Sequence, residues 1–157
     1  MFARGSRTDL SRLSLVLVAE HDPQLREAMV SVLCEHCVVV EAGDGAEALE
    51  KTADLLLAGE RLPDAFVLDV RMPVLSGLHV MTAVRGCDRY VPIVLTTTSD
   101  DLATHSLADQ FGAVVVEKPF DIHALCGAII EVSKDPPPRL PMRVARPPRR
   151  LDRTVTS

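Results

Sequence analysis

The sequence predicts an α/β protein with a doubly wound, five-stranded parallel sheet and the repeat (βα)5. Two observations lead to this fold class. Five short apolar runs do not alternate polar and apolar residues, which is typical of strands that are buried on both faces. Between these runs lie segments whose apolar residues recur at helical spacing. Strands that alternate with helices favour a parallel sheet with helices on both faces and right-handed crossovers.

The predicted strands are five short apolar runs, at residues 15–19, 38–40, 65–68, 93–95 and 114–116. The first predicted helix begins with Asp22 as N-cap and Pro23 at the first helical position. Apolar residues at spacings of three and four mark the helices. In chain order they are Leu25, Ala28, Met29 and Val32; Ala46, Leu49, Ala53 and Leu56; Leu78, Met81 and Val84; the segment 101–111; and Ile122, Leu125, Ile129 and Val132.

Length and charge indicate one folded domain with extensions. A chain of 157 residues is close to the usual size of a single domain. Residues 13–133 carry 7 Lys and Arg against 19 Asp and Glu, so this predicted domain is acidic. Residues 1–12 are expected to form a flexible basic arm. Residues 134–157 hold six of the eleven prolines and seven Lys and Arg, so we expect a disordered Pro/Arg-rich tail.

Composition also argues against several classes of protein. No apolar run approaches the ~18–20 residues of a membrane span, and we expect a cytoplasmic protein without membrane contact. Aromatic residues make up 3%, which leaves no stacking platform for single-stranded nucleic acid. The 25 residues after Val132 are too few and too rich in proline for a helix-turn-helix, so no DNA-binding domain is expected. The four cysteines are expected to be reduced, buried small hydrophobes rather than metal ligands.

Polar residues follow the predicted strands at one edge of the sheet, where open α/β sheets bind their ligands. They are Glu20-His21-Asp22, Asp69, Thr97 and Lys118. Acids, a hydroxyl and an ammonium that converge there indicate phosphoryl and divalent-metal chemistry. Asp69 is placed as a nucleophile, and Lys118 as a point charge for a phosphoryl oxygen. Taken singly, an Asp in a turn, a Thr that ends a strand and a surface Lys are equally ordinary.

In this order and spacing the motifs resemble the receiver domain of bacterial two-component response regulators. The resemblance covers about residues 13–133. It rests on Val-Ala-Glu-His-Asp-Pro at 18–23, Leu-Asp-Val-Arg-Met-Pro at 68–73, Ser-Gly at 76–77, Pro-Ile-Val-Leu-Thr-Thr at 92–97, and Lys-Pro-Phe at 118–120. It implies the flavodoxin-like strand order 2-1-3-4-5, which the family shares with other doubly wound proteins.

The resemblance implies a signalling module rather than an enzyme. A sensor histidine kinase or a histidine phosphotransfer protein would donate a phosphoryl group to Asp69, which becomes 4-aspartylphosphate. Magnesium would be held by Glu20, by Asp69 and by the backbone carbonyl of Arg71. Thr97 and Lys118 would bind oxygens of the acyl phosphate. A downstream protein would dock on the face formed by the fourth helix, fifth strand and fifth helix, and a homodimer is a further implied partner.

Two positions depart from the family pattern. His21 stands where receivers usually carry a second carboxylate, so magnesium binding is expected to be weakened or lost. Val115 stands where receivers carry a switch aromatic. Three hypotheses therefore remain: a stand-alone phospho-accepting receiver, a phosphorylation-independent interaction module, and a flavodoxin-like cofactor carrier. A cofactor carrier would need a phosphate-cradling loop after the first strand, and this sequence has acidic residues there instead.

Overall fold

The computed structural model describes residues 10, 12–98 and 101–134 and confirms the predicted fold class. Five strands form one parallel sheet in the order β2-β1-β3-β4-β5. The elements alternate strictly along the chain. They are β1 (Leu15–Ala19), α1 (Pro23–Leu33), β2 (Val38–Ala42), α2 (Gly45–Leu57), β3 (Ala65–Asp69), α3 (Gly77–Cys87), β4 (Ile93–Thr97), α4 (Leu102–Phe111), β5 (Val114–Glu117) and α5 (Ile122–Ser133).

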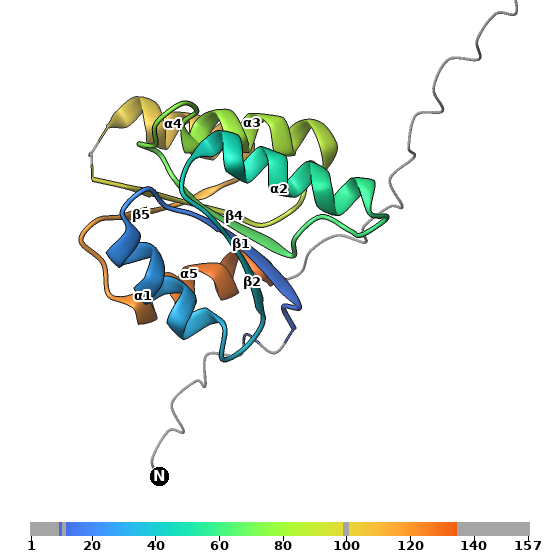
Figure 1. Cartoon of the computed structure of the whole chain (residues 1–157). Helices are drawn as coiled ribbons and strands as arrows, with labels where there is room; N and C mark the ends of the chain where they lie inside the picture. Colours follow the sequence, from blue (N-terminus) through green and yellow to red (C-terminus); the bar gives the residue numbers. More distant parts are fainter. Residues whose placement is uncertain (1–9, 11, 99–100, 135–157) are drawn as a thin grey trace, which may run out of the picture.

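The sheet lies between two layers of helices. Helices α1 and α5 cover one face, and α2, α3 and α4 cover the other (Figure 1). Each layer encloses its own apolar core. Phe66 and Leu68 of β3 pack in the core under α2, α3 and α4, whereas Ala65 and Val67 pack toward α1 and α5. Asp69 follows Leu68 as the last residue of this strand.

Every helix begins at a residue whose side chain accepts a hydrogen bond from the first turn. The N-caps are Asp22, Asp44, Ser76, Asp101 and Asp121. Short acceptor side chains at this position satisfy amide groups that the helix itself leaves unpaired. The predicted start of α1, with Asp22 as cap and Pro23 following it, is confirmed. The capped starts of the helices set the lengths of the loops at the carboxyl edge of the sheet.

The prediction that all five strands are buried on both faces is wrong for the two edge strands. Strands β1, β3 and β4 lie inside the sheet, and every residue of β3 and β4 is buried. Strands β2 and β5 have a neighbour on one side only, and their residues are mostly half-buried or exposed. Val38 in β2 is 65% exposed. An edge strand can have the same apolar sequence as a central one, so the sequence did not separate them.

Two further predictions about side-chain burial need correction. In α2 the buried positions are Gly45, Ala48 and Thr52, whereas Ala53 is exposed. Thr52 tolerates burial because its hydroxyl donates to the Ala48 carbonyl at 2.7 Å. Among the cysteines, all of which are free, Cys126 is buried as expected, but Cys34 and Cys87 are exposed.

The predicted arm and tail lie almost wholly outside the described residues, which begin at Leu10 and end at Lys134. Leu10 belongs to the segment predicted as an arm, and its side chain is 1% exposed in the core under α1 and α5. Among the described helices, none combines the length and the apolar composition needed to cross a bilayer.

Candidate functional site

The carboxyl edge of the sheet gathers the polar residues that the sequence singled out. Glu20 follows β1, and its amide donates to the Ala42 carbonyl of β2 at 3.1 Å. Asp69 is the last residue of β3. Lys118 follows β5, and its amide donates to the carbonyl of Thr97, the last residue of β4, at 2.7 Å. Four consecutive neighbours in the sheet therefore end in candidate site residues.

The Asp69 carboxylate lies at the centre of this group and is only 2% exposed. Its Oδ1 accepts a hydrogen bond from the Arg71 amide at 3.1 Å. Its Oδ2 lies 2.6 Å from His21 Nδ1 and 3.3 Å from Lys118 Nζ. One oxygen is thus fixed by its own loop, while the other faces two nitrogen groups from β1 and β5.

Glu20 is fully buried, and its two oxygens have separate partners. Oε1 accepts from the Asp22 amide at 3.1 Å, and Oε2 accepts from Lys118 Nζ at 2.8 Å. Burial raises the pKa of the Glu20 carboxyl, and the hydrogen bond from Lys118 counteracts part of that rise. The nearby Asp69 carboxylate acts in the same direction as burial, because two negative charges repel each other.

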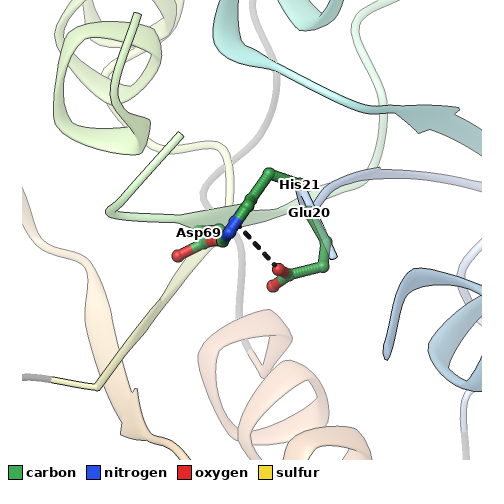
Figure 2. A group of neighbouring side chains, drawn as sticks. All are labelled: Glu20, His21 and Asp69. Atoms are coloured by element: carbon green, nitrogen blue, oxygen red, sulfur yellow. Dashed lines mark hydrogen bonds and ion pairs between the residues drawn. The ribbon is translucent and has the colours of Figure 1, made fainter. Parts of the chain in front are cut away.

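His21 lies beside both acids and is open to solvent. Its side chain is 47% exposed, and Nδ1 also lies 3.4 Å from Glu20 Oε1 (Figure 2). Glu20, His21 and Asp69 each offer a ligand atom, and these atoms lie within 4.8 Å of one another. Figure 2 shows the ring nitrogen directed toward the carboxylates rather than into solvent.

Lys118 follows β5, and its side chain forms ion pairs with residues at the ends of β1 and β3. The ammonium contacts Glu20 and Asp69, and the side chain is 12% exposed. The peptide bond from Lys118 to Pro119 is cis. Phe120 follows and packs against the core under α1 and α5. A lysine held between two buried carboxylates supplies a fixed positive charge at the edge where Asp69 is located.

Thr97 and Val115 are two further positions that the family resemblance singled out. Thr97 is 1% exposed at the end of β4. Val115 pairs with Leu95 in the sheet and packs in the core under α2, α3 and α4. An aliphatic side chain therefore occupies the position for which the family pattern predicts an aromatic.

Two residues that contribute to the site were not singled out from the sequence. Thr96 is the register partner of Asp69 in β4 and is fully buried, and its hydroxyl has no hydrogen-bond partner within the described residues. The run of three threonines is the only sequence signal for it. Gly77 begins α3 beneath Asp69, and a Cβ at this position would lie 2.3 Å from the Asp69 carbonyl oxygen. The Ser-Gly pair that starts α3 was the available signal for Gly77.

Gly77→Ala is expected to destabilise the protein by about 1–3 kcal/mol, because the added methyl group collides with the Asp69 backbone. Urea denaturation followed by far-UV circular dichroism measures this cost. Gly86→Ala in the same helix is the matched control. A Cβ there meets nothing within 4 Å, and alanine is the better helix former by about 1 kcal/mol. Equal stabilities for the two variants would contradict the close approach at Gly77.

A five-stranded parallel sheet in the order 2-1-3-4-5, with acids and a lysine at its carboxyl edge, defines the class of flavodoxin-like, CheY-type folds. The family model of the response regulator receiver domain matches residues 16–130, and the chain belongs to this family. Receiver domains are signalling modules rather than classical enzymes.

Curated relatives and solved structures agree with this assignment. The response regulator MprA of Mycobacterium tuberculosis is 37% identical over 112 residues, which cover 70% of this chain and 46% of MprA. Hybrid signal transduction histidine kinase D of Dictyostelium discoideum is 28% identical over 130 residues, 81% of this chain and 8% of the kinase. The chemotaxis protein CheY4 of Vibrio cholerae superposes with a TM-score of 0.67 at 27% identity, covering 76% of this chain and 98% of CheY4. The chain thus spans less than half the length of these two curated relatives.

Receiver domains generally bind Mg²⁺ at an acidic pocket, and the residues here fit that ion poorly. Mg²⁺ requires near-octahedral oxygen ligands and is reluctant to lose its waters. One of the three candidate ligands is the imidazole nitrogen of His21, and Lys118 already binds one oxygen of Glu20. The donor set therefore departs from the all-oxygen pocket that Mg²⁺ prefers.

Proposed function

We propose that this chain accepts a phosphoryl group on Asp69 from a phosphohistidine of a sensor kinase or a phosphotransfer protein. The observation that carries the proposal is the environment of Asp69 Oδ2. Asp69 is the last residue of a buried strand, and Lys118 Nζ lies 3.3 Å from its Oδ2. Its other oxygen accepts a hydrogen bond from the Arg71 amide. A carboxylate held in one orientation beside a fixed cation is suited to attack phosphorus.

In the proposed reaction, an Asp69 oxygen forms the new bond to phosphorus while the bond from phosphorus to the donor's imidazole nitrogen breaks. The donor histidine leaves as a neutral imidazole when its other ring nitrogen carries a proton at the time of transfer. Lys118 offsets negative charge on the transferring group, and positioning and electrostatics supply nearly all of the catalysis in such transfers. Thr97 is proposed to donate its hydroxyl to an oxygen of the acyl phosphate, because it ends the strand next to Asp69.

The proposed output is a change in the surface formed by α4, β5 and α5, where a downstream protein docks. The strand β5 is an edge strand with half-buried residues, and Leu102 at the start of α4 is 82% exposed. A kinase donor and a protein target together favour a cytoplasmic location. These partners and the location are part of the proposal.

A second candidate is a receiver that binds partners without phosphorylation. It is favoured by His21, which replaces a carboxylate at the metal site, and by Val115, which replaces the aromatic of the family pattern. In this reading His21 and Lys118 balance the charges of Glu20 and Asp69 without a metal ion.

The experiment that separates the two candidates is incubation of the full chain with acetyl phosphate, read by intact mass. The phospho-accepting receiver gains one phosphoryl unit of ~80 Da. Hydroxylamine cleaves acyl phosphates but not phosphate esters of Ser or Thr, so the adduct should disappear on treatment. If no adduct forms from acetyl phosphate or from a phosphohistidine donor, with Mg²⁺, Mn²⁺ or Zn²⁺ present, the first candidate is contradicted and the second is favoured.

A further inference from the structure

His21 changes the type of ligand available at the carboxyl edge. Three atoms from two strand ends converge there: Glu20 Oε1, His21 Nδ1 and Asp69 Oδ2. The nitrogen is a borderline-soft donor and the two oxygens are hard donors. Imidazole suits zinc, copper, iron and nickel, whereas magnesium is bound by carboxylate, carbonyl and water oxygens. Mixed nitrogen and carboxylate ligand sets are those of zinc sites that keep a position open.

The spacing of these atoms agrees with a small tetrahedral ion. Zn²⁺ binds His nitrogen and carboxylate oxygen at about 2.0–2.2 Å, which places neighbouring ligand atoms about 3.3 Å apart. The distance from His21 Nδ1 to Glu20 Oε1 is 3.4 Å. The distance from Nδ1 to Asp69 Oδ2 is 2.6 Å and would have to lengthen. His21 can make that adjustment because it lies between β1 and α1 with its side chain 47% exposed.

The charges of the site also favour a cation. Glu20 and Asp69 are buried close together, and among the contacts of the described residues Lys118 supplies one permanent positive charge to both. A divalent ion relieves the repulsion between two such carboxylates. Lys118 binds Glu20 through Oε2, so Oε1 is the oxygen of Glu20 that faces His21.

We propose that this site binds a divalent transition metal of the zinc class through Glu20, His21 and Asp69, and that His21 selects this metal over Mg²⁺. The inference concerns the same site as the proposed function but does not require phosphoryl transfer. It assigns His21 as a determinant of metal specificity rather than as a defect in a magnesium site.

The test is calorimetric titration of the full chain with Zn²⁺ and, separately, with Mg²⁺, in the absence of any phosphodonor. Wild type is expected to bind Zn²⁺ at least about a hundredfold more tightly than Mg²⁺, since the imidazole nitrogen favours the former. His21→Asp should weaken Zn²⁺ binding and strengthen Mg²⁺ binding, each by about tenfold or more. His21→Gln removes the imidazole without adding a charge and should weaken Zn²⁺ binding with no gain in Mg²⁺ binding.

Three controls keep the result specific to this site. His123→Ala removes an exposed histidine on α5 and should leave Zn²⁺ affinity unchanged. Cys34→Ser/Cys37→Ser removes two thiols near the end of α1 that could bind zinc on their own account, and the His21-dependent binding should persist. Pulsed electron paramagnetic resonance with Mn²⁺, which has little affinity for thiols, should detect an imidazole nitrogen in wild type and none in His21→Gln.

Several results would overturn the proposal. One is equal Zn²⁺ affinity in wild type and His21→Gln, and another is loss of all Zn²⁺ binding in the double cysteine variant. Tighter binding of Mg²⁺ than of Zn²⁺ by wild type would do the same. The proposed function fails differently, by absence of the phosphoryl adduct. Zinc binding without an adduct therefore contradicts only the phosphoryl transfer, and an adduct without His21-dependent binding contradicts only the metal assignment.

Discussion

Replacement of Asp69 by asparagine is expected to eliminate the ~80 Da phosphoryl adduct completely. In the proposed reaction the carboxylate oxygen is the nucleophile, and an amide oxygen cannot form a stable acyl phosphate. Asparagine keeps the shape of the side chain and can still accept the Arg71 amide through Oδ1, which lies 3.1 Å away. The variant should therefore fold, as far-UV circular dichroism can verify, while intact mass after exposure to acetyl phosphate shows only the unmodified protein.

Asp64→Asn is the matched control for this loss. Asp64 lies just before β3, at the opposite end of that strand from Asp69, and its Oδ2 accepts from the amides of Ser14 and Leu15 at 2.8 and 3.0 Å. Asparagine can retain these hydrogen bonds. The control should gain the phosphoryl unit as wild type does. A hydroxylamine-sensitive adduct on Asp69→Asn would place the acceptor elsewhere.

The second large effect is expected for Lys118→Met. Removal of one partner from a buried ion pair typically costs about 3–5 kcal/mol, because the remaining charge is left uncompensated. Here methionine leaves Glu20, which is fully buried, and Asp69 without their shared ammonium. Urea denaturation followed by far-UV circular dichroism measures the loss, and the absence of Trp makes fluorescence a poor choice.

Lys51→Met provides the comparison for Lys118→Met. Lys51 pairs with Glu47 at 2.8 Å on the surface of α2, and such pairs are worth about 0.3–0.5 kcal/mol. In addition, Glu20→Gln should restore part of the stability of Lys118→Met, because it removes one of the two unpaired charges. If Lys118→Met costs no more than Lys51→Met, the ammonium does not compensate the buried acids.

The fold could be predicted from local patterns because each element carries its own signal. Apolar runs marked the five strands, and the ends of β3 and β4 lie only one and two residues beyond the predicted ends, at Asp69 and Thr97. The burial of residues whose exposure depends on neighbouring elements could not be predicted. The exposure of Val38 follows from the place of β2 at the sheet edge, and the burial of Leu10 follows from packing against distant helices.

The candidate site was predictable to a similar degree. Strand ends of a parallel sheet meet at one edge, so the convergence of Glu20, Asp69 and Lys118 could be expected from spacing. The sequence could not show that His21 turns Nδ1 toward Asp69, since a side-chain torsion decides this. Nor could it show that Thr96 is fully buried beside Asp69 without a hydrogen-bond partner among the described residues. Both details depend on packing in three dimensions.

The contact between Lys118 and Glu20 joins residues 98 positions apart in the chain. A contact between residues so far apart in the chain is expected to form late, after the intervening strands have paired. A chain in which β5 has not joined the sheet has Glu20 and Asp69 at the ends of β1 and β3, but it does not have Lys118 beside them. Competence for the chemistry proposed here is therefore gained only when the last strand docks. Fragments that end before residue 118 are therefore expected to gain no phosphoryl adduct from acetyl phosphate, as intact mass can test.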